Sequence, residues 1–203
     1  MIKPLFIFDL DGTLYNVDNK ITKLIDKRIE KFIKKEKKFS DLEFEEFEKK
    51  VPDLLEALKI LKINKDTFYK EVYKNINYKK YFNENGKLKN EIKLLNGKKI
   101  VCSNSCEKHV KGVLKSLNIL DNIDEIYCTD KFTSKLEIYQ YLLKKYNLPV
   151  NKIYVIGNDY SVDIKPARTL GLNTIYIKNN SQVNNIEEAI KIIKYEEENF
   201  KYE

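Results

Sequence analysis

Five short apolar runs are the feature that most limits how this chain can fold. None of them alternates strictly between apolar and polar positions. Strands that are apolar throughout are typical of a parallel sheet covered by helices on both faces. Helical repeats separate the later runs, so we expect an α/β fold with a doubly wound, parallel five-stranded sheet. The runs span residues 5–9, 98–103, 125–128, 152–157 and 173–177.

The long segment between the first two runs has a different character. Residues 16–95 contain no convincing strand, and their apolar residues repeat at helical spacing. Ser40 to Glu43 reads as a capping box that begins a helix, and Asn85-Gly86 reads as a turn. We therefore expect an all-helical domain over residues 16–95, inserted into a core domain of residues 1–15 and 96–203.

Acidic residues follow two of the predicted strands. Asp9 ends the first run and Asp11 follows it in "FDLDGTL", while Asn158, Asp159 and Asp163 lie in "GNDYSVD" after the fourth. The carboxyl ends of parallel strands meet at one edge of a sheet, where ligands bind. Two acidic clusters there would repel each other unless a cation lay between them, and oxygen ligands suit Mg²⁺. Turn and cap residues are the alternative interpretation.

Two further strand ends carry groups suited to an anion. Ser103 and Asn104 end the second run, directly before a predicted helix, and a hydroxyl with helix-start amides can hold a phosphate. Lys135 lies in the first turn of a helix that begins with a capping box from Ser134 to Glu137. A cation there opposes the helix dipole, and a bound anion would offset that cost. An ordinary helix cap and a solvated lysine are the alternatives.

Together these segments resemble the four motifs of the haloacid dehalogenase-like (HAD) hydrolase superfamily. The matching pieces are "FDLDGTL", "SN" at Ser103, Lys135 and "GNDYSVD", within residues 1–15 and 97–180. The helical insert lies where that family places its mobile cap. The resemblance implies a HAD-like Rossmannoid core and a Mg²⁺-dependent phosphatase, a phosphoric monoester hydrolase, that acts on small phosphorylated metabolites through an aspartyl-phosphate.

The resemblance also implies residue roles. Asp9 would be the nucleophile, and Asp11 the acid and base. Dehalogenases lack an acid at the position of Asp11 because a halide needs no proton, so Asp11 favours phosphate esters. Leu136 stands where the family often has proline. The resemblance further implies that Mg²⁺ is bound by Asp9, the Asp11 carbonyl and Asp159. Asn158 or Asp163 would touch the metal or hold its ligands. The phosphoryl group would be bound by Ser103, Asn104 and Lys135.

A finer resemblance points to the pyrimidine 5'-nucleotidase branch. In "SNSCEKHVKGVLKSLNI", His109 matches that branch's histidine, whereas Gly112 replaces its arginine. We therefore expect a nucleoside monophosphate as substrate, with His109 and Tyr15 as candidates for substrate contact. His109 as a helix-surface residue is the alternative. Other candidate functions are a phosphoglycolate or sugar-phosphate phosphatase, a phosphosugar mutase and a non-enzymatic binding module.

The composition bears on partners and location. The net charge is +7, but Arg28 and Arg168 are the only arginines among 38 basic residues, which argues against a nucleic-acid polymer as partner. No apolar run approaches the roughly 20 residues of a membrane helix. The chain has three cysteines and no secretory signal, which indicates reduced thiols and a cytoplasmic protein. A zinc site formed by Cys102, Cys106 and His109 is the less favoured interpretation of these residues. The sequence leaves the oligomeric state open.

Overall fold

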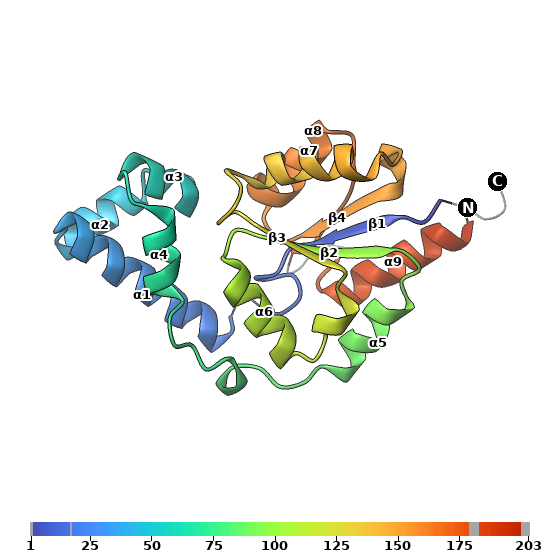
Figure 1. Cartoon of the computed structure of the whole chain (residues 1–203), viewed down its shortest axis with the longest axis horizontal. Coiled ribbons are helices and arrows are strands. Elements are labelled where there is room, and N and C mark those ends of the chain that lie inside the picture. Colours follow the sequence, from blue (N-terminus) through green and yellow to red (C-terminus); the bar gives the residue numbers. More distant parts are fainter. Residues whose placement is uncertain (1, 17, 179–182, 200–203) are drawn as a thin grey trace.

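A computed structural model describes residues 2–16, 18–178 and 183–199, so the outermost residues of the expected core domain, 1 and 200–203, lie outside the described residues. Its centre is one parallel sheet in the order β3-β2-β1-β4-β5, as Figure 1 shows. This confirms the predicted α/β fold class. The strands are β1 (Leu5–Phe8), β2 (Lys98–Ser103), β3 (Glu125–Cys128), β4 (Ile153–Gly157) and β5 (Asn173–Tyr176).

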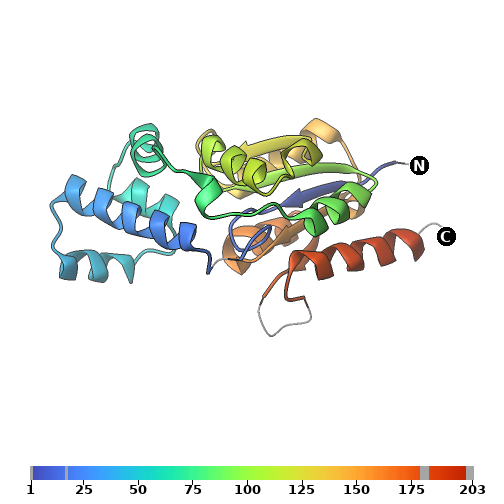
Figure 2. The same cartoon turned by 90° about the horizontal axis from the view of Figure 1, so that it is seen from below.

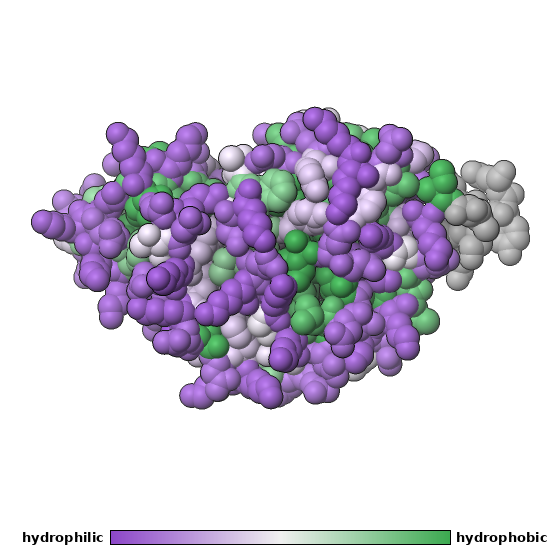
Figure 3. All heavy atoms as spheres, viewed as in Figure 1, coloured by the Kyte–Doolittle hydropathy of each residue, from purple (hydrophilic) through white to green (hydrophobic). Residues whose placement is uncertain are grey.

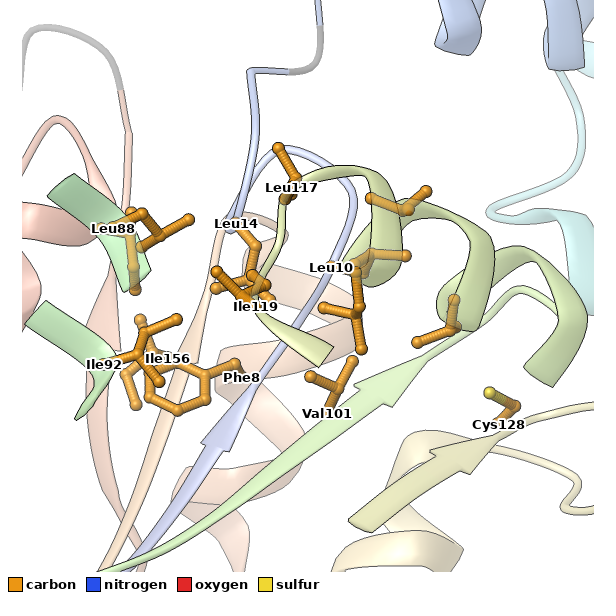
Figure 4. Packing of buried hydrophobic residues seen from close by; sticks show 14 of the residues in the cluster. Phe8, Leu10, Leu14, Leu88, Ile92, Val101, Leu117, Ile119, Cys128 and Ile156 are labelled. Atoms are coloured by element: carbon orange, nitrogen blue, oxygen red, sulfur yellow. The ribbon is translucent and has the colours of Figure 1, made fainter. Parts of the chain in front are cut away.

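Helices cover both faces of the sheet. The first face carries α5 (Gly86–Leu94), α6 (Glu107–Ser116) and α9 (Ile186–Asn199), and the second carries α7 (Lys135–Tyr146) and α8 (Lys165–Thr169). Because side chains alternate along a strand, Phe6 and Phe8 of β1 pack with the first set, while Leu5 and Ile7 pack with the second. Figure 4 shows Phe8 between Ile92 of α5 and Val101 of β2. Burial on both faces explains why β1 is apolar throughout.

Four helices form a separate lobe, the cap, on the side of the sheet where the strands end (Figure 2). They are α1 (Lys20–Lys37), α2 (Asp41–Glu48), α3 (Leu54–Ile60) and α4 (Lys65–Val72). The predicted capping box begins α2, with Ser40 accepting from the Glu43 amide and Glu43 accepting from the Ser40 amide. Buried Ile21, Leu58 and Phe68 make the interior of the cap. No helix in the described ranges has the length and apolarity to cross a membrane.

Helix α5 lies within the predicted insert but belongs structurally to the layers around the sheet. Asn85-Gly86, expected as a turn, instead begins this helix, because the Asn85 side chain accepts a hydrogen bond from the Leu88 amide at 3.0 Å. Asparagine serves equally well as a helix cap and in a turn. Leu88 and Ile92 are fully buried, and Glu91 pairs with Lys194 of α9 at 2.6 Å.

Few polar contacts hold the cap against the core. Lys65 of α4 donates to the Phe132 carbonyl at 2.8 Å, and the Tyr69 hydroxyl donates to the Asn104 carbonyl at 2.9 Å. Figure 3 shows the cap and core as two lobes with an indentation between them. These two contacts join the cap to the segments that follow β3 and β2.

The packing of α5 predicts a difference between two apolar residues on one helix. Ile92→Ala should lower the free energy of unfolding by about 2–5 kcal/mol, because it leaves a cavity beneath the sheet. Leu94→Ala, at a side chain that is 66% exposed, should change it little. Urea denaturation followed by circular dichroism measures both. Equal effects would contradict the assignment of α5 to the core.

Candidate active site

Lys135 joins two carboxylates from neighbouring strands in a buried cluster. Its Nζ lies 2.6 Å from Asp9 Oδ1, at the end of β1, and 2.5 Å from Asp163 Oδ1, beyond β4. All three residues are buried. The lysine stands at the first position of α7, where the sequence predicts a bound anion, and the carboxylates of Asp9 and Asp163 offset its charge there. Asp163 is also held by its second oxygen, which accepts from the Asp159 amide at 3.0 Å.

The cap of α7 differs in one detail from the expected capping box. The Ser134 hydroxyl accepts from the Glu137 amide at 3.2 Å, as predicted. The Glu137 carboxylate, however, accepts from the amide and hydroxyl of Thr133, both at 2.6 Å, instead of from Ser134. The Glu137 carboxylate therefore ties down the residue before the helix cap.

Burial and charge shift the protonation of this cluster. Burial raises the pKa of Asp9 to about 7; the charges of Asp163 and Asp11 act in the same direction, and Lys135 opposes them. Burial alone would lower the pKa of Lys135, yet the charges of Asp163 and Asp9 hold it well above its usual value. Lys135 is therefore a fixed cation, whereas Asp9 changes its charge near neutral pH.

The second oxygen of Asp9 faces other polar groups. The Thr13 hydroxyl donates to Asp9 Oδ2 at 2.9 Å. The amide of Asn158 lies against the same oxygen, with Oδ1 placed 3.1 Å from Asp9 Oδ2 and 2.9 Å from the carbonyl of Asp11. Rotating that amide puts its NH₂ group there and makes both contacts hydrogen bonds. Gly12 has φ +86°, and a Cβ on it would lie 2.3 Å from Asn158 Nδ2, so glycine is required at this turn.

Without that rotation, Asp9 Oδ2, the Asp11 carbonyl oxygen and Asn158 Oδ1 lie side by side, and these three oxygens fit a magnesium ion. Octahedral coordination at 2.0–2.1 Å places neighbouring ligand oxygens about 2.9 Å apart, close to the 2.9 and 3.1 Å found from Asn158 Oδ1. The set combines one carboxylate, one backbone carbonyl and one amide. It includes fewer acids than the sequence predicts, and the described residues contain no cluster of three histidine, cysteine or acidic side chains arranged for a metal.

The structure does not bring the side chain of Asp159, the predicted ligand, to this point. Asp159 is exposed, and its Oδ1 accepts from the amides of Ser161 and Val162 at 2.8 and 3.0 Å. It caps the turn that follows β4, a common use of aspartate before a helical segment. Asn158, one residue earlier, faces Asp9 instead. Asp163 Oδ1 binds Lys135, so this carboxylate orients the lysine that also holds Asp9.

Asp11 is surrounded by hydrogen-bond donors. The Tyr15 hydroxyl donates to its Oδ1, the Ser105 hydroxyl donates to Oδ2 at 3.2 Å, and His109 Nε2 lies 3.3 Å from Oδ1. Burial would raise the pKa of Asp11, but the hydrogen bonds from His109, Tyr15 and Ser105 outweigh it and hold that pKa below its usual value. Burial raises the pKa of Tyr15, and the charge of Asp11 and its hydrogen bond with Tyr15 raise it further. Asp11 is therefore stabilised as a carboxylate.

Both predicted substrate-contact residues contact Asp11 in this structure, and Tyr15 also lines a second pocket, beside Thr13 and Asn16. His109 has no exposed surface and lies behind Asp11, so it is neither a helix-surface residue nor part of a cleft. The hydroxyl of Tyr15 is occupied by Asp11, and its ring packs edge-on against Phe82 at 4.9 Å. Both residues support Asp11.

A cleft between cap and core leads to Lys135. It encloses about 210 Å³ and is lined by Asp53, Leu55 and Glu56 of the cap, and by Asn104, Ser134 and Lys135 among other core residues. Asn104 Oδ1 is buried without a hydrogen-bond partner in the described structure, a polar group that a bound ligand could satisfy. Ser103 is fully buried and accepts from the Ser105 amide at 3.0 Å, so it lies behind the cleft.

Sequence reasoning did not identify several of these residues. Thr13 follows Asp9 in the first motif and Ser105 follows the second, so their positions gave a usable signal. Asp53 and Glu56 reach the cleft only through the folding of the cap, and no motif marks them. The three cysteines are buried and free, and none belongs to the site.

Comparisons with known proteins agree with this arrangement. The family model described as haloacid dehalogenase-like hydrolase matches residues 6–177. No curated protein matches the chain significantly. Among solved structures, a HAD phosphatase from Thermococcus onnurineus is 17% identical with a TM-score of 0.58, covering 95% of this chain and 98% of its own.

Two other structures with different activities share the fold. A candidate β-phosphoglucomutase from Thermotoga maritima is 16% identical, with a TM-score of 0.61 and coverage of 95% and 99%. A 2-haloacid dehalogenase from Pseudomonas syringae pv. Tomato is 13% identical, with a TM-score of 0.56 and coverage of 96% and 99%. These likenesses show the fold and leave the reaction open. The motif carboxylates, the lysine and the matched segment together place this chain in the family of haloacid dehalogenase-like hydrolases.

Proposed function

We propose that this protein is a Mg²⁺-dependent phosphatase of small phosphorylated metabolites. The observation that supports it best is the pairing of two differently supported carboxylates. Asp9 accepts a hydrogen bond from Lys135, which lines the cleft. Asp11, two residues further along the chain, is contacted by different groups, Ser105 and His109. A nucleophile and a separate acid–base group are what ester hydrolysis through a covalent intermediate requires. Asp11 also separates this site from dehalogenation, which needs no proton donor.

The chemistry follows from the surroundings of each carboxylate. The Asp9 carboxylate attacks phosphorus as the ester bond breaks, and Asp11, in its protonated form, gives that proton to the leaving oxygen. Asp11 then takes a proton from water, which attacks the aspartyl-phosphate and releases phosphate. The low pKa of Asp11 favours its base form in this second step. Lys135 stabilises the charge on the transferring phosphoryl oxygens, together with Asn104 at the cleft.

The metal would be held by Asp9 Oδ2, the carbonyl of Asp11 and Asn158 Oδ1. When bound, Mg²⁺ neutralises charge on the phosphoryl group and favours the ionised form of Asp9. Thr13 donates to Asp9 Oδ2 and Lys135 donates to Asp9 Oδ1, so the orientation of this carboxylate is fixed from both sides.

The cleft favours a small, uncharged leaving group. Its volume of about 210 Å³ lies below the roughly 300–1,000 Å³ of pockets that take drug-sized ligands. No aromatic side chain of the described structure lines it, so nothing there stacks on a base. The carboxylates of Asp53 and Glu56 repel an anionic leaving group such as glycolate. We therefore prefer a sugar phosphate over the nucleoside monophosphate suggested by the sequence.

A phosphosugar mutase is the second candidate. The hydrogen bonds from Lys65 and Tyr69 hold the cap over the site, and exclusion of water is what a phosphoryl transfer between two hydroxyls needs. The two functions differ in product. A mutase converts glucose 1-phosphate into its isomer without net release of phosphate.

Replacing the nucleophile should abolish the reaction. Asp9→Asn should lose all measurable phosphate release from p-nitrophenyl phosphate, because an amide neither attacks phosphorus nor accepts the intermediate. Asp121→Asn, at an exposed position outside the cleft, should keep wild-type activity. Beryllofluoride with Mg²⁺ should give a ¹⁹F resonance for the acyl-phosphate mimic in wild type and in Asp121→Asn only. Activity retained in a folded Asp9→Asn protein would rule out the covalent route.

Magnesium binding should depend on pH through Asp9. Because the pKa of Asp9 is raised to about 7, the carboxyl is protonated below that pH, and binding must displace the proton. The apparent affinity for Mg²⁺ should therefore fall about tenfold for each pH unit below 7. Calorimetry at pH 6 in two buffers of different ionisation enthalpy should show close to one proton released per metal bound.

Asp159→Asn is the matched control for this measurement. Since Asp159 caps a turn, this variant should bind Mg²⁺ like wild type, whereas Asn158→Ala should bind it weakly. The reverse order would restore Asp159 as the ligand. An affinity that is constant between pH 5.5 and pH 8 would contradict the proton displacement at Asp9.

A substrate panel tests the shape and charge of the cleft. At one Mg²⁺ concentration, kcat/KM for glucose and ribose phosphates should exceed the values for UMP, CMP and phosphoglycolate. Glu56→Gln should raise kcat/KM for phosphoglycolate selectively, because it removes a repelling charge from the cleft. If UMP or CMP exceeds the sugar phosphates by tenfold, about 1.4 kcal/mol of transition-state discrimination, the nucleotidase alternative is correct.

A further inference from the structure

His109 occupies a position that the proposed chemistry does not explain. It is the only histidine of the chain and is fully buried on α6. Its Nε2 lies 3.3 Å from Asp11 Oδ1, and its Nδ1 lies 3.3 Å from the Tyr78 hydroxyl. The rings of Tyr73 and Tyr78 pack against the imidazole at 4.9 and 5.5 Å. The imidazole can therefore reach the reaction only through Asp11.

The two polar partners of His109 fix the orientation of its ring. A carboxylate only accepts, so Nε2 donates a hydrogen to Asp11. The other nitrogen, Nδ1, faces the Tyr78 hydroxyl, which can donate or accept. Both ring nitrogens are satisfied in this arrangement, and the ring cannot turn over without losing both contacts.

Gly112 makes room for the tyrosine that completes this arrangement. A Cβ at position 112 would lie 2.3 Å from Cε2 of the Tyr78 ring. Glycine in the interior of a helix is unfavourable compared with alanine, so α6 retains a destabilising residue where the ring packs. Tyr78 belongs to the 3-10 turn Tyr78–Lys80, in the segment that returns from the cap to the core. Tyr15, the other aromatic support of Asp11, lies where the chain leaves the core for the cap.

We propose that His109 is a positioning residue that holds the Asp11 carboxylate in the orientation needed for acid–base chemistry, and that Tyr78 and Gly112 fix His109. The inference rests on the proposed phosphatase activity and adds the residues that set its proton-transfer step. Any rotation of the Asp11 side chain would break contacts with Tyr15, Ser105 and His109 together. Asp11 is thus supported from both segments that connect the cap to the core.

The contact between Nε2 and Asp11 can be measured without any enzymatic activity. With ¹⁵N-histidine and a chain free of a polyhistidine tag, the imidazole spectrum contains one residue. At pH 7.5 we expect a hydrogen on Nε2, protected from exchange with water. Tyr78→Phe, which removes the hydroxyl beside Nδ1, should shift the Nδ1 resonance and speed the exchange of the Nε2 hydrogen. A wild-type ring without a hydrogen on Nε2 would overturn the proposal.

Two substitutions at position 109 separate positioning from packing. The amide nitrogen of glutamine reaches the place of Nε2, whereas that of asparagine reaches the place of Nδ1. His109→Asn should lower kcat for an alkyl phosphate by about 10²-fold, with KM unchanged and p-nitrophenyl phosphate much less affected. His109→Gln should restore most of the loss. Single-turnover kinetics must show that phosphoryl transfer limits the rate.

The outcomes distinguish this inference from the proposed function. A wild-type protein that releases no phosphate from either ester overturns the phosphatase itself. An active wild type with equal losses on both esters in folded His109→Asn, or with no rescue by glutamine, overturns the positioning role alone. Gly112→Ala should show the same selective loss on the alkyl ester, because its Cβ displaces the Tyr78 ring. Lys115→Ala, at an exposed position on the same helix, should leave both rates unchanged.

Discussion

The buried contact of Lys135 with Asp9 and Asp163 is the interaction on which this structure depends. The parallel pairing of β1 with β4 brings the carboxyl ends of the two strands together, and with them two acids that would otherwise repel each other. Helix α7 delivers the one cation that both can share. Removing one partner from a buried ion pair typically costs about 3–5 kcal/mol. The charge of Lys135 therefore holds β1, β4 and α7 together at one edge.

Most of the fold could be predicted because it follows from local pattern and general topology. Unbroken apolar strands and intervening helical repeats specify a parallel sheet, and its strand ends then bring Asp9, Lys135 and Asp163 together. Adjacent residues on a tight turn were harder, because Asn158 and Asp159 point in different directions and spacing cannot tell which one faces Asp9. Helix α5 was missed because Asn85-Gly86 is compatible with both a turn and a helix start.

The support of Asp11 could not be predicted for a different reason. Tyr78 and His109 are separated by 31 residues, and their contact depends on how the chain returns from the cap. The absence of a side chain at Gly112 is readable, but its consequence appears only once the Tyr78 ring is in place. The cleft has the same origin, since Asp53 and Glu56 come from the cap and Lys135 from the core. The full burial of His109 was also not predicted, because the spacing of apolar residues along a helix does not show that a histidine lies inside.

The central place of β1 has a consequence for the order in which the protein can form. Both of its neighbours, β2 and β4, follow the whole helical insert in the chain. During synthesis Leu5–Phe8 leave the ribosome before either neighbouring strand, as an apolar segment with no strand to pair with, while the local contacts of α1 to α4 can already form. Sheets built from distant segments form slowly and leave strand edges open meanwhile. The strand that ends beside Asp9 therefore waits for its partners until the whole helical insert has been made.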